Sequence, residues 1–359
     1  MAQSESQTDS EKSEKLREIR FEHSPDFATI LKQLGISLLL TTYQAGKMVV
    51  VGTDPEGKLS LSFENFEQCM GVAVRPGMLA VGARQQVWYL SSAPQIAAQL
   101  PPTGRHDACY LARSSHLTGP IDGHEMAWVV SELWMINTLF SCLCSLDDKH
   151  SFVPRWRPKF ISGLAAEDRC HLNGLCVVDG KPKYVTALGE TDTDHGWRPG
   201  KATGGVIIDI ESNEVVTRGL AMAHSPRVHN GKLWVLDSGL GALANVDLAT
   251  GQRTIVNELP GYCRGMSMFG PFAFIGLSKI RETSTFGGIP IAERRAELKC
   301  GVGVVDLRSG RAVASLQFVS GVDELFDVQV LPNTRLPYVS GPYATVDGKQ
   351  NIWCVPAPR

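Results

Sequence analysis

The sequence predicts an all-β fold, namely a β-propeller with six blades. Short strand-like runs recur along the chain with turn residues between them, which is the signature of a repeat architecture. The clearest repeat lies between residues 227 and 267, where KLWVLD, ALANVDL and TIVNEL read as strands and SGLG and ATGQ as turns. The N-terminal runs ISLLLTTY, KMVVVG and KLSLSF fit the same pattern, so we expect four-stranded blades built from consecutive segments.

The innermost strand of each predicted blade marks the start of a repeat. These strands are expected to begin near Met70, His124, Asn173, Pro226, Arg264 and Phe326. Because the N-terminal runs supply only three strands, the run near Phe326 is expected to complete their blade, so that N- and C-terminal strands pair and close the ring. The run NIWCV near the C-terminus leaves seven blades as an alternative, and a β-sandwich is the competing fold.

Composition and charge predict the domain organisation and narrow the classes of partner. Residues 1–20 are charged and contain no apolar stretch, so we expect a disordered tail followed by one propeller domain over residues 21–359. The net charge of −2 provides no basic field for nucleic acid or an acidic membrane. Nine scattered cysteines without a C-x-x-C pair predict neither disulfides nor structural zinc, and they favour a cytoplasmic location. The oligomeric state is left open, since a propeller closes on itself.

Polar residues at the starts of the innermost strands are expected to converge on one end of the central channel. Three of them, His124, His171 and His224, come from consecutive repeats, and converging imidazoles are typical ligands of a divalent transition metal such as Zn, Fe, Cu or Mn. Alignment of the repeats places Asp122, His171, His224 and Glu324 at equivalent positions, and Asp122 or Glu324 would orient or supplement the histidine ligands. The alternative is that the histidines hydrogen-bond neighbouring blades or line a water-filled channel.

Tyr262 and Arg264, in the sequence GYCRG, are the candidate groups for catalysis together with Glu324. Tyr262 or Glu324 would move a proton, and a guanidinium binds a carboxylate or a developing oxyanion. Arg227 offers a second cation for a carboxylate, and Asn173 adds a polar side chain to the predicted substrate site. The alternative for the arginines is a structural role in ion pairs between blades.

Three long insertions are expected to lie over the same end of the channel. They are residues 101–121, 189–203 and 278–300, and they carry the predicted substrate-binding residues His106, His195, Arg198 and Arg281. The run IAERRAEL in the last insertion has a helical composition and would act as a lid or contact a partner subunit. Surface decoration is the alternative for any of these insertions.

Several motifs resemble those of an uncharacterised bacterial family of conserved proteins of unknown function. They are RHDACYL, DGHE, HLNGLCVVDGKPKYVTALGETD, SPR, LWVLDSG, GYCRG and FGG, and the resemblance extends from roughly Phe21 to the C-terminus. This resemblance implies a single repeat domain and no particular reaction. In architecture the chain is also similar to six-bladed propeller enzymes of the gluconolactonase and amidating-lyase kinds, which hold a metal in the central channel, although their sequence motifs are absent. Similarity to the amidating lyases implies three histidines, a tyrosine and an arginine, which His124, His171, His224, Tyr262 and Arg264 match in residue type.

Two functions from different classes agree with these observations. The first is a metal-dependent enzyme that acts at the channel mouth on a small polar, carboxylate-bearing or peptide-derived substrate. The sequence does not select among lyase, hydrolase, isomerase and oxygenase chemistry. The second is a non-catalytic propeller that binds a protein or peptide through the loops of the same face. The Gly-rich runs GLGALA and GVGVV are not followed by a helix, so no nucleotide cofactor is expected.

Overall fold

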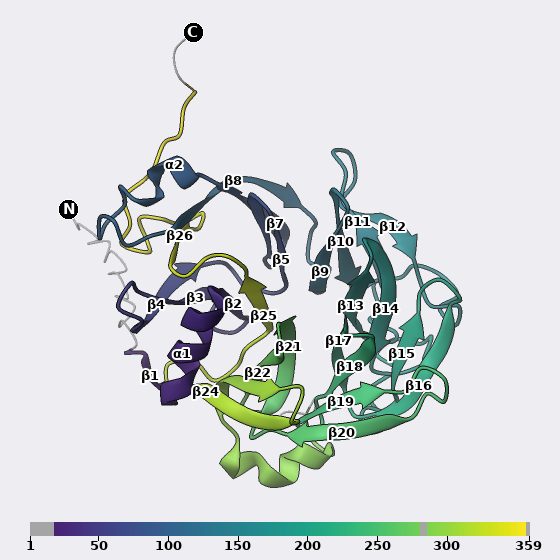
Figure 1. Ribbon diagram of the computed structural model, residues 1–359. Helices are drawn as coiled ribbons and strands as arrows, with labels where there is room; N and C mark the ends of the chain where they lie inside the picture. Colours follow the sequence, from purple (N-terminus) through teal and green to yellow (C-terminus); the bar gives the residue numbers. More distant parts are fainter. Residues whose placement is uncertain (1–17, 281–285, 357–359) are drawn as a thin grey trace, which may run out of the picture.

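Six small β-sheets surround a common axis in the computed structural model, which describes residues 18–280 and 286–356 (Figure 1). Each sheet contains four or five strands, and the strands labelled β5, β9, β13, β17, β21 and β25 lie nearest the axis (Figure 1). The predicted six-bladed β-propeller is therefore confirmed. Most of the predicted N-terminal tail lies outside the described residues.

The six blades are numbered here by the order of their strands along the chain. Blade 1 contains β25 (Asp327–Leu331), β2 (Ser37–Thr42), β3 (Lys47–Thr53) and β4 (Leu59–Asn65). Blade 2 contains β5 (Val72–Arg75), β6 (Met78–Gly82), β7 (Gln86–Ser92), β8 (Ala108–Leu117) and β26 (Pro337–Ser340). Blade 3 contains β9 (Gly123–Val129), β10 (Glu132–Asn137), β11 (Cys142–Ser145) and β12 (Val153–Trp156). Blade 4 contains β13 (Leu172–Val178), β14 (Lys181–Ala187), β15 (Gly205–Asp209) and β16 (Glu214–Leu220). Blade 5 contains β17 (Ala223–His229), β18 (Lys232–Asp237), β19 (Ala242–Val246) and β20 (Arg253–Glu258). Blade 6 contains β21 (Tyr262–Phe269), β22 (Phe272–Ser278), β23 (Cys300–Asp306), β24 (Arg311–Ser320) and β1 (Arg20–His23).

The ring is closed by a strand from the C-terminal part of the chain. β25 pairs antiparallel with β2, with Ser37 opposite Leu331 and Thr41 opposite Asp327. The expectation that the run near Phe326 supplies the innermost strand of the N-terminal blade is confirmed. The innermost strands of blades 2 to 6 also begin close to the positions expected from the sequence.

Two further strands extend blades at their outer edges. β1 pairs antiparallel with β24 in blade 6, and β26 pairs parallel with β8 in blade 2. The run NIWCV, residues 351–355, forms no strand, so it does not add a seventh blade. The chain therefore strengthens existing blades with its end segments.

Packing between blades explains the continuous apolar run of β2. All six of its residues are buried, as expected for a strand covered on both faces. Leu38 and Leu40 pack in one cluster with Val302 of blade 6, whereas Leu39 packs in another with Leu79 of blade 2. Each blade thus shares an apolar core with both neighbours, and this sharing maintains the ring.

Helices are few and short. In α1 (Pro25–Leu34), Phe27, Ile30 and Leu31 share one buried face, and Gly35 ends the helix with a φ of 64° that favours glycine. α2 (Pro94–Ala97) is a single turn, and η1 (Pro290–Glu297) is a 3₁₀ helix. η1 contains most of the IAERRAEL run that was expected to be helical. No helix within residues 18–280 and 286–356 is long and apolar enough to cross a membrane.

The cysteines are free thiols, as the sequence predicts. Eight of the nine are buried, and Cys354 is exposed. Cys142 and Cys144 pack in the same apolar cluster between blades 2 and 3, in agreement with the expectation of buried thiols on one face of a strand.

Two sets of buried polar groups link the innermost strands, one across blades 3 to 6 and one between blades 1 and 2. The Glu125 carboxylate of blade 3 accepts hydrogen bonds from Arg227 Nη1 of blade 5 at 2.8 Å and from the Leu175 amide of blade 4 at 2.9 Å. Arg227 Nε donates to the Met266 carbonyl of blade 6 at 2.9 Å. In the remaining blades, Asp327 Oδ2 of blade 1 accepts a hydrogen bond from a blade 2 backbone amide at 2.9 Å. Arg227 is thus a structural residue, which was the alternative interpretation of this arginine.

The titration of Asp327 is expected to make stability depend on pH. Burial raises the pKa of Asp327 to about 6, whereas an aspartate in an unfolded chain has a pKa of about 3.9. Between these values the folded protein keeps a proton that the unfolded chain has released. The contribution of Asp327 to the free energy of unfolding is therefore fully present below about pH 4. It is lost as the pH rises through about 6, and the total decrease in the free energy of unfolding is about 2–3 kcal/mol. Asp327→Asn should lack this loss when urea unfolding is compared from pH 4 to pH 7, and a variant that keeps the wild-type pH profile would contradict the raised pKa.

Candidate functional site

A cavity of about 340 Å³ lies at the end of the channel where the innermost strands begin. We call it the channel-mouth cavity. Its lining comes from the starts of innermost strands and from loops, and consists of Tyr43, Met70, Asp122, His124, His171, Trp197, Met222, His224, Tyr262, Arg264, Phe286 and Phe326. The structure thus brings the three predicted histidines, the tyrosine and Arg264 to one cavity, together with Asp122 at its exposed rim.

A left-handed backbone conformation recurs at the cavity. Asp122, His171 and Met222 have φ values of 49°, 50° and 51°, and each directly precedes an innermost strand. For a residue with a side chain this conformation costs about 1 kcal/mol, and such strain tends to cluster at functional sites. The same turn in three consecutive blades places all three side chains in the cavity wall.

His124 and His224 are held by equivalent hydrogen bonds. The Nδ1 atom of His124 donates to the Asp122 carbonyl at 3.0 Å, and that of His224 donates to the Met222 carbonyl at 2.9 Å. Because carbonyl oxygens only accept, Nδ1 carries the proton in both rings and Nε2 keeps its lone pair. Burial, with the nearby Arg264 charge, lowers the pKa of both histidines well below the usual range, so both are neutral. The sequence alignment of the repeats paired His224 with His171, and this was wrong because His224 is the counterpart of His124.

His171 forms a carboxylate–imidazole pair. Its Nδ1 lies 2.9 Å from Asp168 Oδ2, which also accepts a hydrogen bond from Trp197 Nε1 at 3.0 Å. The His171 ring packs against Trp197, with 4.5 Å between ring centroids, and contacts the His124 ring edge-on at 5.1 Å. Asp168 therefore orients two side chains of the cavity wall, a role that sequence reasoning missed because Asp168 precedes the strand.

Arg264 is the cationic group of the cavity. Its guanidinium lies 3.6 Å from the centroid of the Phe326 ring. Within the part of the chain that the structure describes, no carboxylate forms an ion pair with it and no acceptor forms a hydrogen bond with it. Arginine keeps its charge in proteins, so the cavity contains a fixed positive charge that the described protein groups leave without a direct partner.

Tyr262 is suited to donate a hydrogen bond. Burial raises the pKa of its hydroxyl far above the usual range, so the group stays protonated at neutral pH. Its hydroxyl lies 3.9 Å from Met222 Sδ, a weak acceptor, and its ring contacts His224 and Phe286 edge-on. The raised pKa therefore favours Tyr262 as a hydrogen-bond donor, and the transfer of a proton by this group stays a prediction.

The other predicted site residues that the structure describes do not line the cavity. His106 hydrogen-bonds the Leu336 and Pro101 carbonyls at the outside of blade 2, and Arg198 is exposed beside the Trp197 ring. His195 pairs with Asp194 in the same loop as Trp197. Asn173 accepts a hydrogen bond from Thr186, and Arg227 pairs with Glu125. Glu324 accepts a hydrogen bond from the backbone amide of Gln44. Arg281 lies outside the described residues.

Two of the three predicted insertions reach the cavity. Trp197 comes from residues 189–203 and Phe286 from residues 278–300, and both line the cavity. The expected insertion 101–121 does not line the channel-mouth cavity, since about half of it is β8, the strand that pairs with β7. The polar residues ARSSH lie within β8, and because of them the sequence of this segment resembles a loop. Trp197 and Phe286 were missed as site residues, although an aromatic residue in a long loop over a predicted site was the available signal.

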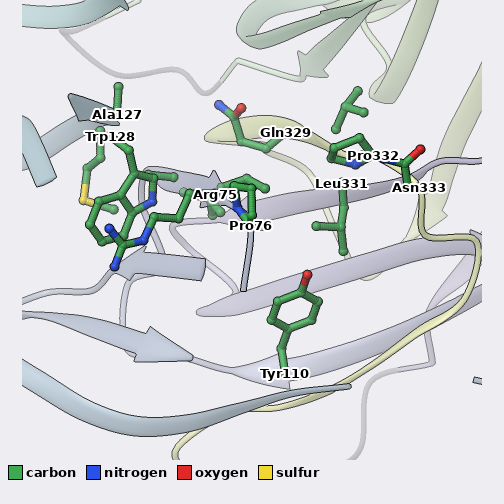
Figure 2. A pocket seen from close by; sticks show the side chains of 14 residues that line it. Arg75, Pro76, Tyr110, Ala127, Trp128, Gln329, Leu331, Pro332 and Asn333 are labelled. Atoms are coloured by element: carbon green, nitrogen blue, oxygen red, sulfur yellow. The ribbon is translucent and has the colours of Figure 1, made fainter. Parts of the chain in front are cut away.

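A second cavity, of about 470 Å³, lies at the opposite end of the channel, where β5, β9 and β25 end. Figure 2 shows Arg75 against the Trp128 ring on one side of this cavity and Gln329 and Asn333 on the other. The Arg75 guanidinium lies 3.8 Å from the Trp128 ring centroid and donates to the Ser131 carbonyl at 3.1 Å. None of the predicted site residues lines this cavity, so we place the candidate site at the channel mouth.

Residues 25–339 match the family model of a domain of unknown function, DUF4915. The chain belongs to the DUF4915 family. The match covers nearly the whole propeller, so the expected membership of a family without an assigned reaction is confirmed. No curated protein sequence matches the chain.

Two solved structures share the fold of the DUF4915 chain. A chain in the crystal structure of a nidogen/laminin complex is 10% identical, with a TM-score of 0.52 over 83% of this chain and 99% of that chain. A protein of unknown function from Bacteroides caccae is also 10% identical, with a TM-score of 0.50 over 82% of this chain and 98% of that chain. At these identities the similarity shows the fold alone.

Asp168→Asn is expected to destabilise the protein by about 1–3 kcal/mol. The amide would remove the negative charge and would place an NH2 group beside the His171 Nδ1 donor, which lies 2.9 Å from Oδ2 and 3.0 Å from Oδ1 of the carboxylate, so one side of the group would bring two donors together. Asp147→Asn is the matched control, because Asp147 pairs with His150 at the same spacing in the chain but at the surface. Urea unfolding of both variants checks this, and equal effects would mean that the buried pair has no special role.

Proposed function

We propose that this protein is an enzyme whose active site is the channel-mouth cavity and whose substrate is a small molecule with a carboxylate. The observation that supports this most directly is Arg264, whose guanidinium has no ion pair or hydrogen bond to any described residue. Taking a charge out of water without a partner is costly, so such a group is typical of a site that receives an anion. A planar guanidinium suits a carboxylate because it can form two parallel hydrogen bonds.

The neighbouring side chains are arranged for polar recognition at the same place. His124 and His224 each hold the proton on Nδ1, which leaves a basic Nε2 atom, and the Nε2 atom of His124 is buried without a partner. Tyr262 supplies a protonated hydroxyl. In the proposed reaction Arg264 binds the substrate carboxylate, and Tyr262 donates a hydrogen bond to a substrate oxygen. The Nε2 atoms of the imidazoles accept a proton or a hydrogen bond from the substrate, or bind a metal ion.

A divalent transition metal at the three histidines is part of this proposal. The donors fit in type, because His124, His171 and His224 each engage Nδ1 with a protein group and keep Nε2 for a ligand, as metal-binding histidines do. Over the described ranges, no three His, Cys, Asp or Glu side chains are already grouped to hold one ion, so the imidazoles would move closer on binding. When bound, such an ion supplies Lewis-acid polarisation of a substrate oxygen.

Elemental analysis of the purified protein tests the metal. We expect stoichiometric Zn, Fe, Cu or Mn, with loss of the metal in His171→Ala and His224→Ala while circular dichroism shows an intact fold. His150→Ala is the matched control, because His150 is exposed and far from the cavity lining. If the purified protein contains no metal and chelators do not change its thermal unfolding, the metal part of the proposal is wrong. The proposal is then reduced to a metal-independent site at Arg264.

Exchange of two arginines tests the anion site without knowledge of the substrate. Arg264→Met is expected to raise the free energy of unfolding of the ligand-free protein by about 1 kcal/mol, because it removes a partly buried charge that contacts the Phe326 ring but that no described carboxylate or hydrogen-bond acceptor compensates. Arg227→Met is expected to lower it by about 3–5 kcal/mol, because Glu125 would stay buried without its cation. Both changes are measured by urea unfolding.

The opposite signs separate a binding group from a structural one. If Arg264→Met destabilises the protein as much as Arg227→Met, Arg264 has a structural role and the proposed site loses its main support. A propeller that only binds a protein partner would show another pattern, in which loop substitutions abolish partner capture and Arg264→Met leaves it intact.

A further inference from the structure

We infer that the substrate carries a flat aromatic or similarly bulky apolar body on the same molecule as its carboxylate. This inference rests on the proposed function, and it adds a substrate class that a carboxylate site alone does not define. The observation behind it is the division of the cavity wall into a cationic part and an aromatic part.

The aromatic part is formed by side chains from separate elements. Trp197 and Phe286 come from the two insertions, and Tyr262 comes from the start of β21. Phe286 stands edge-on to Tyr262, with 5.2 Å between ring centroids, and Met222 adds a polarisable thioether to the same wall. Aromatic and methionine side chains contact flat apolar ligands well, and they adapt to the shape of the ligand.

The Trp197 ring is held in place before any ligand binds. It is only 3% exposed, its Nε1 donates to Asp168 Oδ2 at 3.0 Å, and it contacts the tilted His171 ring with 4.5 Å between ring centroids. The indole donor is therefore already used, and the ring offers the cavity an apolar surface. A site with a fixed aromatic wall loses little conformational entropy on binding a flat ligand.

The cationic part lies at Arg264, whose guanidinium stacks on Phe326. The other acidic and polar groups do not extend this part across the cavity, since Asp122 is exposed at the rim and Asp168 is occupied by His171 and Trp197. The part of the wall formed by Trp197, Phe286 and Met222 has no free strong hydrogen-bonding group, so hydroxyl groups of a sugar acid placed against it would lose their hydrogen bonds to water. A ligand with one carboxylate and one apolar body matches both parts of the wall.

The size of the cavity agrees with this class of ligand. A cavity of about 150 Å³ is large enough to bind benzene, and the channel-mouth cavity is about 340 Å³. It therefore has room for one or two fused rings together with a carboxylate and a bound ion.

Binding of simple carboxylates to the full-length protein, as purified, tests the inference. The aromatic probes are phenylacetate and indole-3-acetate, and the polar probes are acetate and malate, measured by isothermal titration calorimetry. We expect the aromatic probes to bind at least ten-fold more tightly than either polar probe. Arg264→Gln should weaken the aromatic probes at least ten-fold, and Trp197→Leu and Phe286→Leu should weaken them without weakening acetate.

Arg75→Gln is the matched control, because Arg75 also lies in a cavity beside an aromatic ring, but at the opposite end of the channel (Figure 2). Binding should be unchanged in this variant, and loss of binding in Arg75→Gln with retention in Arg264→Gln would overturn the inference. If Arg264→Gln fails to fold, the Trp197 and Phe286 variants still decide it, because unchanged aromatic binding in both contradicts the inferred wall.

The remaining outcomes separate this inference from the proposed function. If malate or acetate binds in an Arg264-dependent manner and the aromatic probes do not, the carboxylate site stands and the inferred substrate class is wrong. If no carboxylate binds in a manner that depends on Arg264, both are wrong.

Discussion

The antiparallel pairing of β25 with β2 is the constraint on which the channel-mouth cavity depends. This pairing joins a strand near the C-terminal end of the fold to one near its beginning, and it fixes the curvature of the whole ring. The cavity wall contains residues from all six blades, from Tyr43 in blade 1 to Tyr262 in blade 6. An open ring would separate these side chains, so ring closure makes the site.

Below the cavity the guanidinium of Arg227 forms an ion pair, whereas at the cavity that of Arg264 has none with any described carboxylate. Arg227 pairs with Glu125 and hydrogen-bonds backbone carbonyls of other blades, which satisfies a guanidinium within the protein. Arg264 lies one blade further along the ring and contacts the face of Phe326. The same residue type thus serves the fold in one place and is available to a ligand in the other, and the partners of each guanidinium distinguish the two roles.

Sequence reasoning identified the repeat and the strands that line the channel, because strand periodicity and turn residues are local signals. It also brought His124, His171, His224, Tyr262 and Arg264 to one end of the channel, because strand starts share that end. It misaligned His224 because the sequence placed the start of this innermost strand near Pro226, whereas β17 begins three residues earlier, at Ala223. It missed Asp168, Trp197 and Phe286 because tertiary contacts place them. His106 was expected in the site because β8 reads as a polar loop and not as a strand.

The outermost positions of β1 and β26 have a consequence for how the molecule tolerates damage. Each is the last strand of its sheet, beyond four strands that already form a complete blade. Fraying of either strand would expose β24 or β8 at the periphery and leave the innermost strands paired. Local unfolding can therefore begin at the outer edge of a blade. Three further strands of the same sheet separate β1 or β26 from the innermost strand beside the cavity.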